Sequence, residues 1–275
     1  MDSKIPFFIS IPHSGERIPP AATWLQGLDE RIQMCDVDRF VDLLYRPVIE
    51  DLDIPSVVTP WHRYFCDLNR SPEDVDANSV EGAANEPSHR RGFIWQITTK
   101  GQKLLDQPIS REVFQKIVTE HFEPFHEQVR SQYKSFFEKG FTQVYHLDAH
   151  SMPSVGTKEH RDPGERRADA VVSDFNGVSC SKHFKDLVVQ SFTNAGLTIK
   201  ENWPYVGGRI TETYGKPKLG QNCIQVELNR ALYMDEETKQ LLPEKAKQLQ
   251  LVVQKAVMQI HAAIATEPRR AGKPF

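Results

Sequence analysis

Residues 144–153 have the sequence VYHLDAHSMP, and this stretch is the most informative one about the fold. Its apolar, aromatic and branched residues are typical of a buried strand. Asp148 and His150 come at the carboxyl end of this strand, which is where ligands bind in open α/β sheets. An acid close to a histidine can orient an imidazole that binds a metal. The alternative is an ordinary strand end with a surface histidine, and other segments have to decide between the two.

The composition sets broad limits. The chain has 275 residues, 39% of them hydrophobic, which suffices for one large α/β domain or two small ones. A formal charge of -3 gives no reason to expect a nucleic-acid partner or an anionic membrane surface. No apolar run approaches the roughly 20 residues of a membrane span. The short apolar run at the amino terminus ends at Pro12 and His13, which predicts a first strand rather than a signal peptide.

The cysteines favour a reducing compartment. None of them forms a CxxC pair, so neither a disulfide framework nor a zinc–thiolate site is indicated. We expect buried free thiols and a cytoplasmic protein. The four residues are Cys35, Cys66, Cys180 and Cys223.

A second histidine follows another predicted strand. Residues 7–11 are apolar and lead into the sequence PHSG at 12–15, where a glycine lets backbone approach a ligand closely. His13 and Glu16 have the HxxE spacing that can place a nitrogen and a carboxylate on one metal. Prolines at 19 and 20 argue against a continuing helix, so Glu16 is predicted to be a loop residue and not a ligand.

Acidic residues precede a predicted helix within residues 36–45, where Phe40 and Leu43 fall at helical spacing. Asp36 or Asp38 is a natural N-cap for this helix. Asp38 at the helix start can equally direct its carboxylate at a metal, and both interpretations stay open.

The strand predicted at 222–228 carries an acid among apolar residues. Glu227 is that acid, and buried unpaired glutamates are rare. Either it has a chemical role or it pairs with Arg230, three residues later.

Two arginines are candidates for binding an anionic substrate. Arg70 follows an apolar run and precedes a Ser-Pro turn, a suitable position for a bidentate clamp on a carboxylate. Its alternative role is a salt bridge to Asp67. Arg209 follows two glycines, which indicates either backbone opened around a small ligand or a hairpin turn.

The other elements complete an alternating α/β pattern without repeats or linkers, so we predict a single domain over residues 1–275. His121 and His126 fall within the long predicted helix and receive no chemical role. The tail, residues 267–275, is predicted to be disordered. Further strands are predicted at 54–59, 91–97, 168–174 and 197–202, helices at 110–137, 180–195 and 239–265, and long loops at 71–90 and 156–167.

In order along the chain, these motifs resemble the N-formylglutamate amidohydrolase family. The resemblance extends from residue 7 to about residue 235, and the ordered set is more specific than any single motif. The segments that carry it are PHSG (12–15), DRFVD (38–42), DLNR (67–70), DAHSMP (148–153), NGVSC (176–180), PYVGG (204–208) and QVELNRALYM (225–234).

The resemblance implies a phosphorylase/hydrolase-like three-layer α/β fold, with a central mixed, mostly parallel sheet flanked by helices. It also implies hydrolysis of a linear amide C–N bond, releasing formate from N-formyl-L-glutamate or a related small N-acyl amino acid in histidine breakdown. Alternatives are an amidase or carboxypeptidase-like hydrolase acting on a peptide or cell-wall fragment, and a non-catalytic carboxylate-binding protein. The oligomeric state is left open.

The resemblance also assigns roles to residues. One Zn²⁺ per chain would be held by His13, Asp38 and His150, with Asp36 and Glu16 as alternatives to Asp38. Glu227 would act as general base and then as general acid. The predicted substrate-binding residues are Arg70, Asn69, Arg209 and Tyr214, and the residues predicted to support the ligands are Asp148 and Ser151. The chain departs from some family members at Arg39-Phe40 and at Arg209, which border the predicted substrate pocket.

Overall fold

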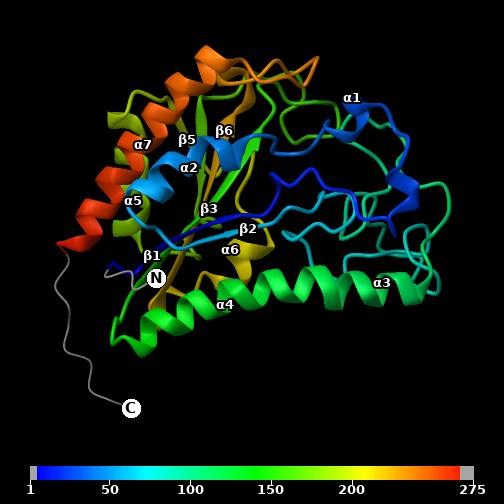
Figure 1. Ribbon diagram of the computed structural model, residues 1–275, viewed down its shortest axis with the longest axis horizontal. Helices are drawn as coiled ribbons and strands as arrows, with labels where there is room; N and C mark the ends of the chain where they lie inside the picture. Colours follow the sequence, from blue (N-terminus) through cyan, green and yellow to red (C-terminus); the bar gives the residue numbers. More distant parts are fainter. Residues whose placement is uncertain (1–4, 267–275) are drawn as a thin grey trace.

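The computed structural model describes residues 5–266 of the chain, and a six-stranded sheet forms its centre (Figure 1). Four strands in a row are parallel, and the pairing of β4 with β6 is antiparallel. This confirms the predicted mixed, mostly parallel sheet. In spatial order the strands are β2 (Ser56–Val58), β1 (Phe7–Ile11), β3 (Val144–Met152), β6 (Gln221–Asn229), β4 (Ala170–Ser173) and β5 (Ile199–Glu201).

Strand β3 lies in the middle of this sheet and is buried at all nine positions. A strand covered on both faces carries a nearly continuous apolar sequence rather than an alternating one, and residues 144–149 have that character. His146, Asp148 and His150 follow one another at intervals of two residues and therefore share one face of the sheet.

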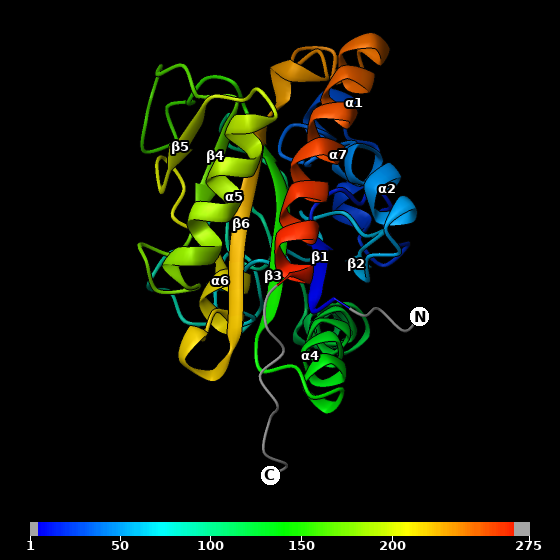
Figure 2. The ribbon, with the colours of Figure 1, turned by 90° about the vertical axis from the view of Figure 1, so that its left-hand side faces the viewer.

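Three helices cover one face of the sheet. They are α2 (Val41–Asp51), α5 (Lys182–Asn194) and α7 (Pro243–Ala265), and Figure 2 shows α5 and α7 in front of the sheet. Their buried residues join the sheet in one apolar cluster that includes Val48, Phe184 and Val257. Ser181 caps α5 by accepting a hydrogen bond from the Phe184 backbone N–H.

The opposite face is covered by a long helical segment and by loops. Helix α3 (Arg111–Ile117) continues through the π-helical turn η2 (Val118–Phe122) into α4 (Glu123–Glu138), which confirms the helix predicted at 110–137. Helix α6 (Arg209–Tyr214) packs on the same face. The short helical turns are η1 (Thr23–Leu25), α1 (Glu30–Gln33), η3 (Pro217–Leu219) and η4 (Arg230–Leu232).

Some local predictions were wrong. Residues 91–97 form isolated bridges instead of a strand. The segment after Gly208 is helix α6, which excludes the alternative of a hairpin turn there. Helix α7 begins at Pro243, four residues later than predicted. The N-cap of α2 is Phe40, at a positive φ of 69°, so neither Asp36 nor Asp38 caps it.

The prediction of buried free thiols is confirmed. All four cysteines are buried and free. None of the helices within residues 5–266 combines the length and hydropathy of a membrane span. The prediction of a disordered tail at 267–275 lies outside the described residues.

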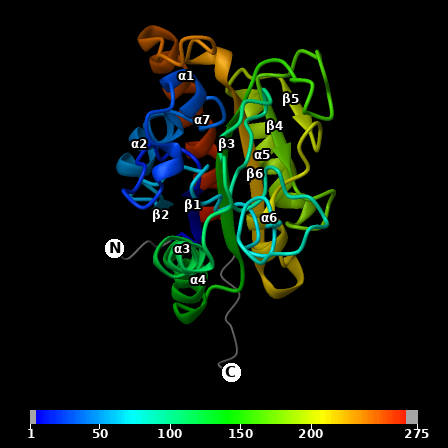
Figure 3. The ribbon, with the colours of Figure 1, turned by 90° about the vertical axis from the view of Figure 1, so that its right-hand side faces the viewer.

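The topology places several strand ends together. Because β1, β3 and β6 are parallel neighbours, their carboxyl ends meet at one edge of the sheet. Figure 3, which shows the molecule from the side opposite Figure 2, has long loops running in front of the strands. The end of the sheet is therefore enclosed by loops that bring distant segments to β1, β3 and β6.

Candidate active site

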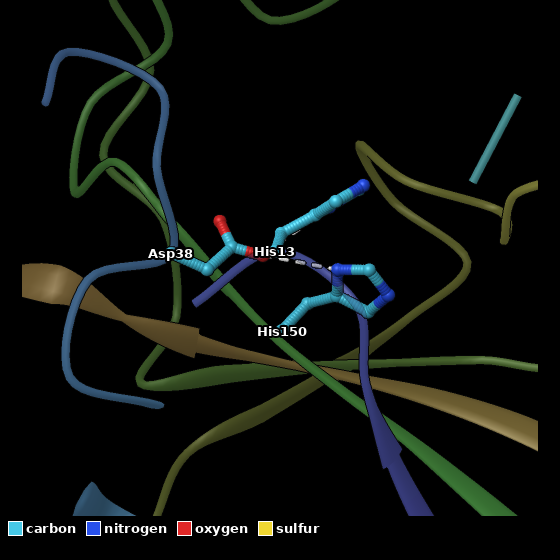
Figure 4. Close-up of side chains that lie close together, drawn as sticks. All are labelled: His13, Asp38 and His150. Atoms are coloured by element: carbon cyan, nitrogen blue, oxygen red, sulfur yellow. Dashed lines mark hydrogen bonds and ion pairs between the residues drawn. The ribbon is translucent and has the colours of Figure 1, made fainter. Parts of the chain in front are cut away.

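Three side chains that are far apart in the sequence converge at this edge. His13 lies just beyond β1, Asp38 lies in the loop before α2, and His150 lies near the end of β3. Each residue offers one ligand atom, and these three atoms lie within 4.8 Å of one another. The three residues are only 1–2% exposed. Figure 4 shows the side chains pointing toward one another. The backbone N–H of Asp38 donates to the His13 carbonyl at 3.0 Å, which fixes the loop beside the strand.

Each histidine turns one ring nitrogen toward Asp38. Nδ1 of His150 lies 3.0 Å from Oδ2 of Asp38, and Nδ1 of His13 lies 3.6 Å from the same oxygen. The Nε2 atoms face two other buried acids, with His150 Nε2 2.9 Å from Asp148 Oδ2 and His13 Nε2 2.7 Å from Asp67 Oδ1. Each Nε2–H can therefore be donated to a carboxylate, an arrangement that orients metal-binding histidines and makes them more basic.

The other oxygen of Asp38 is held by arginine. Its Oδ1 accepts a hydrogen bond from Arg230 Nη2 at 2.9 Å and lies 3.7 Å from Arg63 Nη1. Arg230 in turn donates from Nε to the Ser151 hydroxyl at 3.1 Å. Burial alone would raise the pKa of Asp38, but the neighbouring imidazoles of His13 and His150 and the charge of Arg63 hold that pKa well below its usual value. Asp38 is thus a carboxylate fixed in position with one oxygen facing the histidines.

The buried carboxylates also favour the protonated, positively charged form of His150. Burial would lower the pKa of His150, but the carboxylates of Asp148 and Asp38 raise that pKa well above its usual value. Nδ1 of His13 is buried without a hydrogen-bond partner among the described residues. Such an orphaned nitrogen, beside a second imidazole and a carboxylate oxygen, is the donor set that Zn²⁺ takes in catalytic sites with a fourth position open. The residues therefore fit a zinc ion.

The alternative ligands are engaged elsewhere. Asp36 Oδ2 accepts hydrogen bonds from the Tyr64 hydroxyl at 2.6 Å and from the Thr99 backbone at 3.0 Å. Glu16 bonds to the Arg39 guanidinium, with Oε1 2.7 Å from Nε. Of the three carboxylates considered, Asp38 is the one that the structure brings to the two histidines.

Glu227 lies beside the three residues without joining them. It stands directly opposite His150 in the register between β3 and β6 and is 6% exposed. Its Oε1 accepts a hydrogen bond from Gln225 at 2.8 Å. Burial raises its pKa, against the lowering effect of His150. The alternative role, in which Glu227 pairs with Arg230, is not supported, because Arg230 donates hydrogen bonds to Asp38 and Ser151.

These groups open into a cavity of about 660 Å³. Its lining includes His13, Asp38, His150 and Glu227, together with residues of the loops after β2, β3 and β5. The site thus combines a candidate metal centre, a buried carboxyl group and access for a small molecule.

The profile of the N-formylglutamate amidohydrolase family matches residues 5–234. The chain belongs to this family. It is 26% identical to the N-formylglutamate deformylase of Pseudomonas aeruginosa, over 85% of this chain and 84% of that protein. It is 28% identical to the N-formylglutamate deformylase of Pseudomonas putida, over 96% of this chain and 95% of that protein. The crystal structure of N-formylglutamate amidohydrolase from Ralstonia eutropha JMP134 has the same fold, with a TM-score of 0.81 at 23% identity, covering 94% of this chain and 95% of that one.

Two of the substrate-binding residues predicted from the amidohydrolase family line the cavity. Arg70 donates hydrogen bonds to the backbone carbonyls of Arg91 and Asn69, at 3.2 and 3.0 Å. The other N–H groups of its guanidinium remain for a ligand. Asn69 is already occupied by protein groups. Its Oδ1 accepts a hydrogen bond from the Ile210 backbone at 2.8 Å, at the start of α6. Gly208 is needed there, because a Cβ at that position would come within 2.3 Å of the Asn69 amide.

The other two predictions are not supported by the positions of the residues. Arg209 is exposed and pairs with Glu212 at 3.2 Å, and it does not line the cavity. Tyr214 is 5% exposed, packs in the core and lies 2.8 Å from His126 Nδ1 through its hydroxyl. The cause is helix α6, which directs Arg209 outward and Tyr214 toward α4.

Two residues at the site were missed in the sequence analysis. Asp67 holds His13, and Arg63 donates to Asp67 Oδ2 at 3.0 Å while facing Asp38. The signal for Asp67 was its place at the start of the DLNR family motif, where we considered it only as a partner of Arg70. Gly15 was expected to let the backbone approach a ligand closely. Its lack of a side chain instead makes room for the backbone of Pro60 and Trp61.

Proposed function

We propose that this protein is a zinc-dependent amidohydrolase that hydrolyses N-formyl-L-glutamate to formate and L-glutamate. The single observation that carries the proposal is the convergence of His13, Asp38 and His150 in a buried cavity beside Glu227. Two Pseudomonas relatives that are N-formylglutamate deformylases support the choice of substrate. Four free, buried cysteines fit a reducing cytoplasm, where histidine breakdown would supply the substrate.

In this proposal His13 and His150 would hold Zn²⁺ through Nδ1, and Asp38 would hold it through the carboxylate oxygen that faces them. When bound, the metal would lower the pKa of a water molecule and polarise the formyl carbonyl group. Asp67 and Asp148 keep each Nε2–H engaged, so that the two Nδ1 lone pairs point into the site.

Glu227 transfers a proton from the attacking water to the leaving amine. It accepts a proton from the water that attacks the formyl carbon, and it then donates this proton to the nitrogen of glutamate as the C–N bond breaks. Water supplies the oxygen that formate gains, and the amine leaves with one additional hydrogen. Glu227 is buried directly opposite His150 and lines the cavity, a position that suits both roles.

The substrate carboxylates would be bound by arginines of the cavity wall. Arg70 has guanidinium donors left for this purpose, and a planar guanidinium binds a carboxylate through two parallel hydrogen bonds. Arg90 and Arg161 are exposed at the cavity mouth, where they favour an anionic substrate. A substrate with two carboxylates could bind Arg70 with one of them and an outer arginine with the other.

A larger N-acyl amino acid or peptide fragment is a second candidate substrate. The favouring observation is the cavity of about 660 Å³, part of whose wall is formed by Ser88 and His89 of the polar loop that follows β2. A non-catalytic carboxylate-binding protein is less well supported, because Glu227 would then be a buried acid without a chemical role to explain its burial.

The test is a metal assay combined with turnover of a substrate panel. We expect about one zinc per chain and fastest release of formate from N-formyl-L-glutamate, compared with N-formyl-L-alanine, N-acetyl-L-glutamate and N-formyl dipeptides. Faster turnover of the dipeptides would select the second candidate. A protein with full zinc content that hydrolyses none of these compounds would contradict the proposed activity.

A further inference from the structure

A chain of buried polar groups extends from the candidate metal site into the core, away from the cavity. Asp148 accepts a hydrogen bond from His150 through Oδ2, and its Oδ1 accepts one from the Ser10 hydroxyl at 2.5 Å. The Ser10 oxygen also lies 2.7 Å from His146 Nε2. Nδ1 of His146 lies 3.2 Å from the Tyr133 hydroxyl. Ser10, His146 and Asp148 are each 0% exposed, although the proposed hydrolysis uses neither Ser10 nor His146.

Adjacent parallel strands build this chain. In the register between β1 and β3, Phe8 is opposite His146, and Ser10 is opposite Asp148. Residues two apart in a strand share a face, so His146, Asp148 and His150 point to the same side. Phe8 stacks on the His146 ring with centroids 4.1 Å apart. The imidazole therefore has a fixed plane, and its two nitrogens have fixed neighbours.

The direction of each hydrogen bond follows from counting protons. Ser10 has one hydroxyl proton and donates it to the carboxylate of Asp148. The Ser10 oxygen can therefore only accept from His146, which requires the proton of the neutral imidazole to be on Nε2. Nδ1 is then an acceptor, which agrees with two donors near it, the Tyr133 hydroxyl at 3.2 Å and the Cys223 thiol at 3.3 Å. Burial lowers the pKa of His146 to about 4, so the ring is neutral at pH 7.

We propose that Ser10 and His146 are positioning residues that strengthen zinc binding at His150 by fixing Asp148. All donors in the chain point toward Asp148, so both of its oxygens act as acceptors. Asp148 is thereby held as the partner of His150 Nε2–H, and Nδ1 of His150 stays directed at the metal. This inference rests on the proposed zinc site, and it assigns a function to polar groups that are otherwise costly to bury.

The two histidines of the site differ in this respect. Asp67, the partner of His13, is held by Arg63 Nη2 at 3.0 Å and by Trp95 Nε1 at 2.9 Å. Asp148 has its hydrogen bonds from Ser10 and His150. Loss of the Ser10 hydroxyl therefore leaves one of the two oxygens of Asp148 without this donor, and the carboxylate becomes free to rotate away from His150.

The test measures zinc affinity by competition with a chromophoric chelator at pH 7. Removing the direct partner of a metal-binding histidine typically lowers metal affinity 10–100-fold. Ser10 acts on His150 only through Asp148, so we expect Ser10→Ala to lower zinc affinity about tenfold, the lower end of that range. Ser10→Thr keeps the hydroxyl and should restore most of the affinity. Ser179→Ala is the matched control, because its equally buried hydroxyl donates to the Cys223 carbonyl at 2.7 Å and touches neither Asp148 nor His150. We expect no change in this control.

A double-mutant cycle separates positioning from general destabilisation. If Ser10 acts through Asp148, then Ser10→Ala should have an effect of less than about twofold in the Asp148→Asn background, because the two changes share one interaction. Melting temperatures of the metal-free variants show that each is folded. Equal affinity of wild type and Ser10→Ala, or an equal loss in Ser179→Ala, would overturn the positioning role and leave the zinc site intact. Absence of zinc binding in the wild type would overturn both the positioning role and the proposed zinc site.

Discussion

Nε2 of His13 lies 2.7 Å from Oδ1 of Asp67, and Nδ1 of the same ring is buried without a partner among residues 5–266. Asp67 is itself 0% exposed and carries hydrogen bonds from Arg63 and Trp95. Burial would raise the pKa of Asp67, but the charges of His13 and Arg63 keep that pKa well below its usual value. This ionised acid therefore directs a histidine nitrogen into the site.

Asp67→Asn should weaken zinc binding although Asp67 is not one of the three proposed ligands. An amide oxygen still accepts from His13 but lacks the charge that increases the basicity of the ring, so we expect zinc affinity to fall about 10–100-fold. Chelator competition measures the change. Asp76→Asn is a useful control, because Asp76 is equally buried and bonds the backbone of His89 and Asn78. Unchanged affinity in Asp67→Asn would remove it from the metal site.

His150→Ala removes a proposed ligand. We expect zinc content to fall from about one per chain to near zero, with the far-ultraviolet circular dichroism of the wild type retained. His183→Ala, at an exposed position on α5, should keep its zinc. Full retention of zinc in His150→Ala, measured by atomic absorption, would exclude His150 as a ligand.

Arg70→Lys tests recognition of the substrate carboxylate. Lysine keeps the positive charge but loses the planar fork that binds a carboxylate through two bonds. We expect kcat/KM for N-formyl-L-glutamate to fall about tenfold, equivalent to roughly 1.4 kcal/mol, with zinc content unchanged. Arg130→Lys, at an exposed pair with Glu123 and Glu127, should have wild-type kinetics. Wild-type kinetics in Arg70→Lys on every carboxylate-bearing substrate would exclude the role.

Asp162→Asn should show how the loop after β3 is fixed. The Asp162 carboxylate bonds the Arg167 guanidinium twice, each at 2.7 Å, and both residues are at most 8% exposed. Burial would raise the pKa of Asp162, but hydrogen bonds from Arg167 lower it. At pH 7 the substitution leaves Arg167 without its counter-charge and should reduce the free energy of unfolding by about 3 kcal/mol.

The sign of the pH dependence follows from the lowered pKa. The stabilisation is present above the unfolded-state pKa of about 3.9 and is lost as the pH falls through the lower pKa of the folded state. The difference between wild type and Asp162→Asn in urea unfolding should therefore shrink below about pH 4. An equal difference at pH 7 and pH 3 would show that the ion pair does not cause it.

Much of the candidate site follows from sequence because it depends on strand topology. His13 and His150 end predicted strands, and the carboxyl ends of parallel neighbours meet at one edge of a sheet. Glu227 could be placed there for the same reason, as a polar residue late in an apolar strand. Asp38 came from its family motif, since two acids near the helix start were otherwise equivalent.

The remaining features depend on contacts between distant segments. The pairing of His13 with Asp67 joins residues 54 positions apart, and loop conformation at such distances is not set by local sequence preference. Helix α6 has six residues and follows two glycines, so its periodicity was too short to predict that Arg209 points outward and Tyr214 inward. Residues 91–97 have strand-like composition but find no strand to pair with along their length.

The kcat of Glu227→Gln, measured together with its zinc content, tests the proposed hydrolysis most directly. Glutamine has nearly the same shape, but it cannot take a proton from water. General acid–base catalysis contributes roughly 10²–10⁴-fold in rate, so kcat for N-formyl-L-glutamate should fall by about that factor while zinc content stays at the wild-type level. Glu212→Gln, at an exposed pair with Arg209, should have wild-type activity. Full activity in a zinc-loaded Glu227→Gln enzyme would contradict the mechanism, and loss of zinc would make Glu227 a ligand instead of the base.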